Sequence, residues 1–124
     1  MNGNKLLLDT NALIGYLQGD IALEKMVTSS EILIPVISII EFLAFNKIED
    51  RDRKLLYDFA SEVQVVDLKK DDINLIELIS NIRITHKTKL PDAIIAGMAI
   101  YSKATLVTND KGFDKIKNLS LLTF

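Results

Sequence analysis

Cysteine is absent from these 124 residues, and histidine occurs only once. Without cysteine the chain forms neither disulfides nor thiolate metal sites, which fits a reducing compartment. A single histidine argues against the histidine-rich type of zinc site. The longest apolar run, residues 93–101, has nine residues, whereas about 20 are needed to span a bilayer. We therefore expect a cytoplasmic protein with no membrane segment, and the apolar run before Asp9 is too short for a signal peptide.

An excess of charge of one sign is also missing. The 15 lysines and arginines stand against 17 aspartates and glutamates, and the net charge is −2. A protein that grips nucleic acid by broad phosphate neutralisation is expected to be strongly basic. If this chain acts on nucleic acid, local lysines or bound cations must neutralise the phosphates. Linkers, low-complexity segments and internal repeats are absent as well, so the length predicts one domain over residues 1–124.

Short apolar runs alternate with helical patterns along the chain. The runs predict strands at residues 6–8, 32–37, 63–66, 105–108 and 121–123. Helical spacing predicts helices near 13–17 and 20–27, from Ser38 onward, over 51–61, 69–84 and 91–102, and a turn with a short helix at 109–117. Strands that alternate with helices favour a parallel sheet covered on both faces. The predicted fold class is α/β, a three-layer α/β/α sandwich around a mainly parallel sheet of about five strands.

Four acidic residues follow predicted strands or lie near predicted helix starts: Asp9, Glu41, Asp92 and Asp110. Each has a purely structural explanation. Asp9 suits the N-cap of a helix, and Glu41 would complete a capping box with Ser38. Asp92 lies in a first helical turn, and Asp110 belongs to an Asn-Asp turn. Taken singly, none of the four requires a catalytic role.

Taken together, the four carboxylates suggest a site. Ligands bind beyond the carboxyl ends of parallel strands, where Asp9 and Asp110 are expected. Carboxylates that converge repel one another unless a cation lies among them. Oxygen ligands without histidine or cysteine suit Mg²⁺ or Mn²⁺, ions that activate water and clamp a phosphodiester. Asp67 also follows a predicted strand, and spacing alone does not exclude it.

Four segments carry a resemblance that extends over essentially the whole chain. They are Leu6-Leu-Leu-Asp9-Thr10-Asn11, Ser38-x-x-Glu41-Phe-Leu, Leu90-Pro91-Asp92-Ala-Ile-Ile-Ala96 and Leu106-Val-Thr108-Asn109-Asp110. Each motif alone is weak, but the four in this order resemble the PIN domain. The spacing is most similar to that of the single-domain VapC-type toxins of bacterial and archaeal toxin–antitoxin pairs.

The resemblance implies a metal-dependent endoribonuclease that uses Mg²⁺ or Mn²⁺ and acts on RNA. It also implies a cognate antitoxin protein and a homodimer. By position, the catalytic and metal-binding acids would be Asp9, Glu41, Asp92 and Asp110. Thr10 and Asn11 match the polar residues that orient the first acid, and Thr108 and Asn109 match those before the last. The family places no catalytic acid after the third strand, which demotes Asp67.

One departure from the family pattern affects the last motif. Many relatives carry an Asp-Phe pair shortly after the Thr-Asn segment. Here Gly112 precedes Phe113, and an acid comes one place late, as Asp114. Asp110 therefore carries most of the fourth acid's role, with Asp114 as a supporting metal ligand. The position of a second metal is correspondingly open.

Basic and aromatic residues near the motifs allow two readings. Lys87, Lys89, Lys111 and Lys115 flank Asp92 and Asp110 as candidate RNA contacts, or they are solvated surface lysines. His86 is expected on the surface rather than as a general base. Most of the aromatic side chains in predicted helices are expected to pack in the core rather than to stack on bases: Tyr16, Phe42, Phe45, Tyr57, Phe59 and Tyr101.

Three alternative functions compete with a VapC-type toxin. The first is a PIN-domain nuclease of RNA maturation or decay that has no antitoxin. The second is a catalytically inactive PIN-like module that binds RNA or protein, although acids at all four motif positions argue against it. The third is a phosphoryl-accepting Asp9, as in receiver or haloacid dehalogenase folds. The Asp-x-Asp of the dehalogenases is absent, because Asn11 stands at its second position. The target RNA, its cleavage site and the antitoxin do not follow from the sequence.

Overall fold

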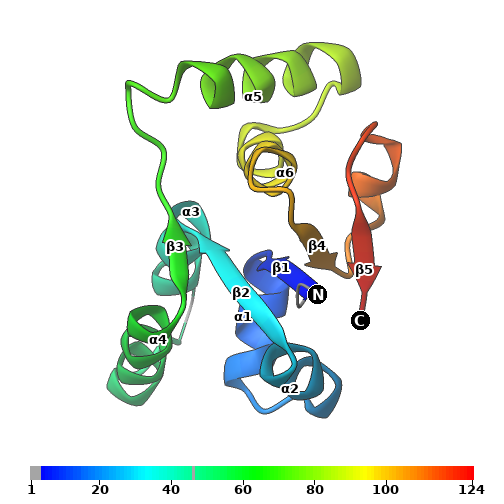
Figure 1. The fold of residues 1–124 in the computed structure, drawn as a ribbon. Coiled ribbons are helices and arrows are strands. Elements are labelled where there is room, and N and C mark those ends of the chain that lie inside the picture. Colours follow the sequence, from blue (N-terminus) through cyan, green and yellow to red (C-terminus); the bar gives the residue numbers. More distant parts are fainter. Residues whose placement is uncertain (1–3, 46) are drawn as a thin grey trace.

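The computed structural model describes residues 4–45 and 47–124, in which five strands form one sheet. The strands are β1 (Asn4–Leu8), β2 (Ser30–Pro35), β3 (Gln64–Val66), β4 (Thr105–Thr108) and β5 (Leu121–Thr123). Their order is β3-β2-β1-β4-β5, and every neighbouring pair is parallel (Figure 1). The chain builds outward from β1 to β3 and then returns to place β4 on the other side of β1. The predicted parallel sheet is thus confirmed.

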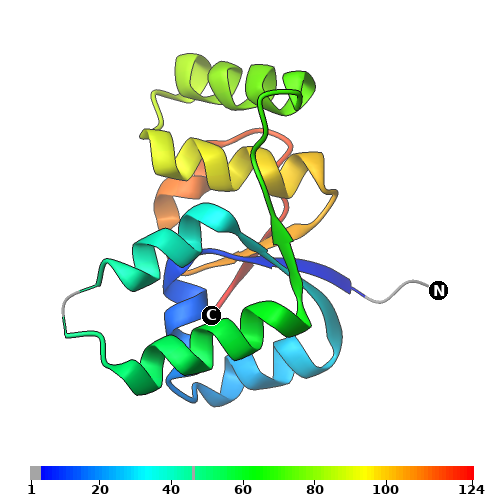
Figure 2. The same cartoon turned by 90° about the vertical axis from the view of Figure 1, so that its left-hand side faces the viewer.

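Helices lie on both faces of this sheet (Figure 2). One face carries α1 (Thr10–Leu17), α2 (Ile21–Thr28), α3 (Val36–Leu43) and α4 (Asp50–Glu62). The other carries α5 (Ile73–His86), α6 (Leu90–Tyr101) and the 3₁₀ helix η1 (Lys111–Lys115). Alternate side chains of a strand point to opposite faces, so Leu6 and Leu8 join the first cluster and Leu7 joins the second. The three-layer α/β/α sandwich is confirmed.

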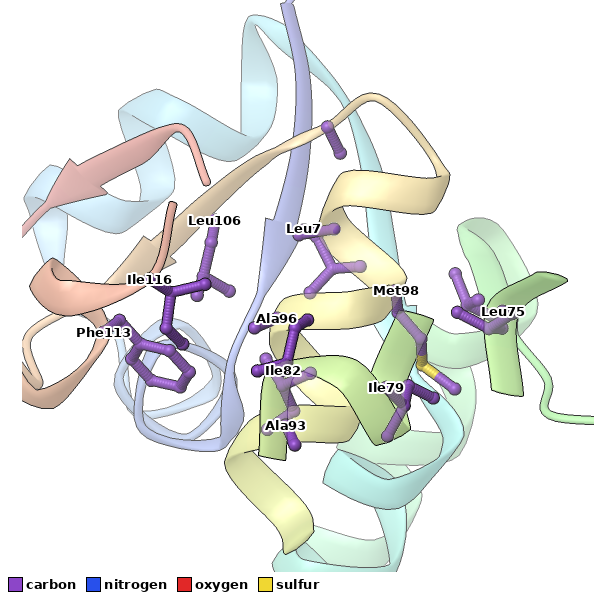
Figure 3. Close-up of a cluster of buried hydrophobic side chains, with 14 of the residues drawn as sticks. Leu7, Leu75, Ile79, Ile82, Ala93, Ala96, Met98, Leu106, Phe113 and Ile116 are labelled. Carbon is purple, nitrogen blue, oxygen red and sulfur yellow. The ribbon is translucent and has the colours of Figure 1, made fainter. Parts of the chain in front are cut away.

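The cluster around α6 connects the sheet to the outer helix α5 (Figure 3). Leu7 and Leu106 of the sheet and Met98 of α6 are completely buried. A methyl group added at Gly97 would lie 2.6 Å from Ile79 Cγ1, so a glycine here lets α5 lie against α6. Since α6 begins with the segment that carries Asp92, this packing also positions one of the four acids.

Helix α3 begins two residues earlier than the sequence predicts. It starts at Val36, directly after Pro35, which ends β2 and occupies the N-cap without a side-chain cap hydrogen bond. The β-branched Val36 and Ile37 favour a strand locally, but they form the first turn of the helix. Ser38 is therefore the third helical residue and buried. The predicted Ser38–Glu41 capping box is wrong, and Glu41 lies in the second turn with its side chain available for other contacts.

Helix α5 begins at Ile73 rather than at Lys69. Asp72 Oδ2 accepts a hydrogen bond from the Lys69 backbone N–H at 2.8 Å, which holds residues 69–72 in a turn. Across residues 4–45 and 47–124, no helix combines the length and the apolar character needed to cross a membrane.

Candidate active site

The carboxyl ends of β1 and β4 form a crevice at the point where the strand order reverses. The Asp9 backbone N–H donates to the Val107 carbonyl oxygen at 3.2 Å, which ties the end of β1 to β4. In open α/β sheets, ligands bind at such a switch point. Asp9 directly follows β1, and Asp110 lies two residues beyond β4. Two of the four predicted acids therefore stand on either side of the crevice.

Asp9 is buried, with 4% of its surface exposed, and is the N-cap of α1. Its Oδ1 accepts the Ala12 backbone N–H at 2.8 Å. Burial raises the pKa of Asp9, hydrogen bonds from the Thr108 hydroxyl and from Ala12 lower it, and the charges of Asp110 and Asp92 raise it again. The net pKa lies above the ordinary value of 3.8. The helix-cap and active-site explanations of Asp9 are therefore compatible.

Glu41 reaches the crevice from α3 on the same face of the sheet as α1. The Thr10 hydroxyl donates a hydrogen bond to Glu41 Oε1, and it also lies 3.2 Å from the buried Ser38 hydroxyl. A hydroxyl has one hydrogen to donate. The Thr10 hydroxyl therefore directs its hydrogen toward Glu41, with the Ser38 hydroxyl as a second, longer contact. The resemblance suggested that Thr10 orients the first acid, but in the structure it contacts the second.

Asp92 lies in the first turn of α6, on the opposite face of the sheet, and is half-buried. Burial raises its pKa, and the charges of Asp110 and Glu41 raise it further. The charges of Lys89 and Lys115 lower the pKa but do not cancel the increase. Asp92 thus responds to carboxylates from two other elements, which indicates that the acids share one electrostatic site.

Asp110 is more exposed and caps η1. Its Oδ1 accepts the Gly112 backbone N–H at 2.8 Å, while its own N–H donates to Thr108 Oγ1 at 3.0 Å. Thr108 is buried, and its hydroxyl connects the Asp110 backbone N–H to the Asp9 carboxylate through two hydrogen bonds. Asn109 Oδ1 accepts from Asn11 Nδ2 at 3.3 Å, so the polar residues after β1 and β4 bridge the crevice.

All four acids line one groove of about 280 Å³. Its remaining walls come from α1, α6, the segment after α3 and the segment after β4: Thr10, Asn11, Ile14, Ile95, Phe45 and Phe113. The convergence predicted from four separate segments of the sequence is therefore present in the tertiary structure.

The groove offers only oxygen ligands from carboxylates, a donor set that suits Mg²⁺ or Mn²⁺. Burial is the main cause of the raised pKa values of Asp9 and Asp92, and repulsion by the neighbouring carboxylates adds to it; a cation would relieve that repulsion. Within the part of the chain that the structure describes, no three acids or histidines stand close enough to form a ready-made metal site.

Three other candidates lie outside the groove walls. Asp114 is exposed on η1, and Asp67 is exposed after the edge strand β3. His86 is the half-buried last residue of α5 rather than part of a surface loop. All four candidate lysines are exposed: Lys87, Lys89, Lys111 and Lys115. Of these, Lys89 and Lys115 affect the pKa of Asp92.

Sequence reasoning missed the aromatic wall of the site. Phe42 and Phe59 are buried and Tyr16 is half-buried, as predicted. Phe45, Tyr57 and Tyr101 are exposed, so their assignment to the core is wrong. Phe45 comes two residues after α3 ends and lines the groove. Its helical spacing from Phe42 resembled core packing because the end of α3 was not visible in the sequence.

Residues 6–119 match the family model described as PIN domain. VapBC2 from Rickettsia felis, crystallised with a DNA fragment from its promoter, has a similar structure, with a TM-score of 0.81 and 22% identity over 97% of this chain and 98% of that chain. A toxin–antitoxin complex from Klebsiella pneumoniae gives a TM-score of 0.77 and 24% identity over 95% and 96%. DNA-bound VapBC from Salmonella typhimurium gives 0.79 and 21% over 97% and 98%. No curated protein sequence matches significantly.

Proposed function

The chain belongs to the PIN domain family, and we propose on this basis that it is a metal-dependent endoribonuclease and the toxin of a VapBC-type pair. One observation carries the proposal. Carboxylates from the ends of β1 and β4 and from the helices α3 and α6 line a single groove at the switch point of the sheet. Metal-assisted hydrolysis of a phosphodiester uses such a cluster of acids to hold cations and to accept a proton.

Asp9 and Asp92 would hold Mg²⁺ or Mn²⁺, directly or through water, and Glu41 and Asp110 would complete the site. The bound ion would supply charge stabilisation for the phosphoryl oxygens and acidify a bound water. Asp114, which is outside the groove walls, has at most an outer role. The hydrogen bond between Asn11 and Asn109 would hold the two sides of the crevice in a fixed position relative to each other.

The chain's own residues would direct an in-line hydrolysis. Glu41, oriented by Thr10, or Asp110 accepts a proton from the attacking water. The water oxygen forms a bond to phosphorus, and the bond from phosphorus to the 3′-oxygen breaks. A proton from solvent or from a carboxyl then completes the 3′-hydroxyl, and the other product keeps a 5′-phosphate.

Lysines near Asp92 would position the RNA backbone. Lys89 precedes α6 and Lys115 ends η1, and both charges act on Asp92. We therefore expect these two to contribute more to RNA binding than Lys87 and Lys111, although all four are exposed. Replacing Lys89 or Lys115 by Ala should reduce the salt dependence of binding by about one unit of slope, because each removes one phosphate contact.

The proposed partner is a cognate antitoxin whose tail covers the acidic groove. A basic side chain from that tail would substitute for the charge of the metal. Two structural relatives are VapBC complexes, which supports a partner of this kind. Growth arrest on expression, relieved by the neighbouring gene, would separate a toxin from a PIN nuclease of RNA maturation or decay. A toxin of this kind would act in the cytoplasm.

Self-association is the second proposed contact. Exposed apolar side chains on α5 and at the start of α6 support a homodimer face: Ile73, Ile84 and Leu90. Sedimentation of the parent and of Ile84→Lys would test it, and a parent that remains monomeric at high concentration would exclude it.

RNA cleavage under three ion conditions tests the proposed activity. Parent protein, Asp9→Asn and Asp67→Asn are incubated with a pool of structured RNAs in Mg²⁺, Mn²⁺ or EDTA. We expect the parent and Asp67→Asn to cleave with either ion, and no cleavage by Asp9→Asn or in EDTA. Asp67 is the matched control because it is an exposed strand-end carboxylate outside the groove. Cleavage that persists in EDTA would reject the metal mechanism.

A further inference from the structure

Arg83 carries a positive charge that the proposed function does not yet use. It is an exposed residue in the last turn of α5, and its Nε–H donates to the Thr88 carbonyl oxygen at 3.2 Å. A guanidinium is a planar fork of N–H donors. Its remaining donors, on the two terminal nitrogens, meet no protein acceptor and no carboxylate among residues 4–45 and 47–124. Arg83 is therefore held on one edge and open to a ligand on the other.

The turn between α5 and α6 fixes this guanidinium in place. The turn consists of residues 87–89, and Thr88 at its centre is buried. Lys87 has a left-handed φ of 52°, which reverses the chain and brings the Thr88 carbonyl oxygen to Arg83. A guanidinium bonded through Nε keeps its outer edge in one direction, so less entropy is lost when a ligand binds there. Lys87 and Lys89 are exposed in the same turn, and their flexible stems must be ordered on binding.

Positive charge accumulates at this turn although the protein is acidic overall. The net charge is −2, yet the segment between Glu77 and Asp92 contains Arg83, Lys87 and Lys89 and no acidic residue. In Figure 2 the connection between α5 and α6 lies on the same side as η1, at the end of α6 that carries Asp92. A positive surface therefore lies near the acidic groove, and such a surface raises the local concentration of an anionic substrate.

We infer that Arg83 binds a phosphate of the RNA backbone that flanks the phosphate to be cleaved. The inference rests on the proposed nuclease function. Each terminal nitrogen of the fork would donate to one phosphate oxygen, a paired geometry that arginine forms with phosphate and lysine does not. The lining of the acidic groove includes Asp92 of α6 and no described residue of α5. Arg83 therefore holds a flanking phosphate and not the reacting one.

The position of Arg83 does not favour a role in self-association. The proposed homodimer face contains Ile73 and Ile84, which are 60% and 78% exposed. Consecutive residues of a helix are rotated by about 100°, so Ile84 faces a different direction from Arg83, whose guanidinium contacts the turn after α5. Arg83→Gln should therefore sediment as the parent does. A change in oligomeric state would assign Arg83 to assembly and overturn the inference.

Binding of fluorescein-labelled oligouridylate to the cleavage-deficient Asp9→Asn protein tests the contact. In this background, Arg83→Gln, Arg83→Lys and Arg53→Gln are compared by fluorescence anisotropy between about 50 and 200 mM potassium chloride. Arg53→Gln is the matched control, because it removes the same charge from an exposed arginine of α4, on the opposite face of the sheet.

The salt dependence distinguishes a phosphate contact from a structural role. We expect Arg83→Gln to weaken binding about tenfold and to reduce the slope of log K against log salt by about 0.7, the loss of one phosphate contact on a single strand. Arg83→Lys keeps the charge, so it should keep the slope and lose only part of the affinity. Arg53→Gln should match the background protein in both quantities.

RNAs with one neutral methylphosphonate linkage at a time locate the bound phosphate. The linkage that removes the Arg83 contact should weaken binding to the background protein by the same factor as Arg83→Gln, and the two changes together should cause no additional loss. In the protein with an intact Asp9, Arg83→Gln should raise the KM for RNA cleavage and leave kcat nearly unchanged, because a flanking phosphate is held equally before and during the reaction.

The outcomes separate the phosphate contact from the proposed function. If the parent cleaves RNA and Arg83→Gln keeps the affinity and the salt slope of its background, the contact is wrong and the nuclease proposal stands. If the parent never cleaves but the slope still depends on Arg83 and not on Arg53, the nuclease proposal fails and the contact remains. Equal losses of affinity in Arg83→Gln and Arg83→Lys with an unchanged slope would show that Arg83 only supports the turn, and would overturn the inference.

Discussion

The Thr10 hydroxyl donates a hydrogen bond to Glu41 Oε1, although 31 positions separate the two residues. Thr10 is the first residue of α1 and Glu41 lies in α3, so the bond joins two helices on one face of the sheet. The same hydroxyl lies 3.2 Å from the Ser38 hydroxyl. These two contacts fix the Thr10 side chain and give the Glu41 carboxylate a defined direction toward the groove.

Removal of the Thr10 hydroxyl should slow catalysis without unfolding the protein. For Thr10→Val we expect kcat to fall roughly 10- to 100-fold, because a misplaced catalytic group loses its alignment. Thr10→Ser keeps the hydroxyl and should retain most of the activity. Single-turnover cleavage rates measure the effect. Lost activity in Thr10→Ser together with parent-like activity in Thr10→Val would show that the methyl group, not the hydrogen bond, is important.

Neutralising Asp9 should stabilise the metal-free protein. Burial raises the folded-state pKa of Asp9 above 3.8, so the folded state binds this proton more tightly than the unfolded state does. Stability then falls as pH rises from about 3.8 through the raised folded pKa and stays low above it. Asn retains the N-cap acceptor. At neutral pH and in EDTA, Asp9→Asn should therefore melt at a higher temperature than the parent.

Two further conditions check the sign of this effect. The difference in melting temperature between parent and Asp9→Asn should shrink as the pH is lowered through the raised folded-state pKa toward 3.8, because the Asp9 carboxyl becomes protonated first in the folded state and below 3.8 in the unfolded state as well. Mn²⁺ should raise the melting temperature of the parent more than that of Asp9→Asn. A parent that is more stable than Asp9→Asn throughout this range in EDTA would contradict the argument.

Asp110 and Asp114 should differ sharply in their effect on cleavage. Asp110 lines the groove and its charge raises the pKa of both Asp9 and Asp92, whereas Asp114 is exposed on η1 away from the groove walls. We expect Asp110→Asn to lower kcat at least tenfold, a size typical of losing one group that acts in the chemical step. Asp114→Asn should cleave at nearly the parent rate, measured with saturating Mn²⁺. If Asp114→Asn instead lost activity and Asp110→Asn did not, the role of the fourth acid would belong to Asp114.

Gly97→Ala should destabilise the fold through the contact between α5 and α6. The added methyl group would meet Ile79 Cγ1 at 2.6 Å, and such overpacking costs about 1–3 kcal/mol. Urea denaturation measures the free energy of unfolding. In the double variant with Ile79→Ala, the cost of adding the Gly97 methyl group should be much smaller, because the clashing atom is gone. Additive losses would place the strain elsewhere.

The positions of Asp9 and Asp110 were predictable because each follows a strand that the local sequence pattern identifies. Apolar runs mark buried strands, and the ends of parallel strands lie at one edge of the sheet, so carboxylates at strand ends converge. The sequence pattern likewise predicted the bounds of β4 and β5. Only the resemblance, and not the spacing, separated Asp67 from the other acids. The structure supports that separation, because β3 is an edge strand two positions from β1.

The alternation of strands and helices, the parallel sheet and the four acidic segments follow from patterns that are visible in the chain alone, because each pattern is short-range. Packing between distant segments sets where α3 begins and ends, and therefore that Glu41 is held by Thr10 and that Phe45 is exposed at the groove. The physical reason is that local propensity competes with packing against distant segments. Val36 and Ile37 favour a strand in isolation, yet in the folded chain they form the helical turn that brings Glu41 to the site.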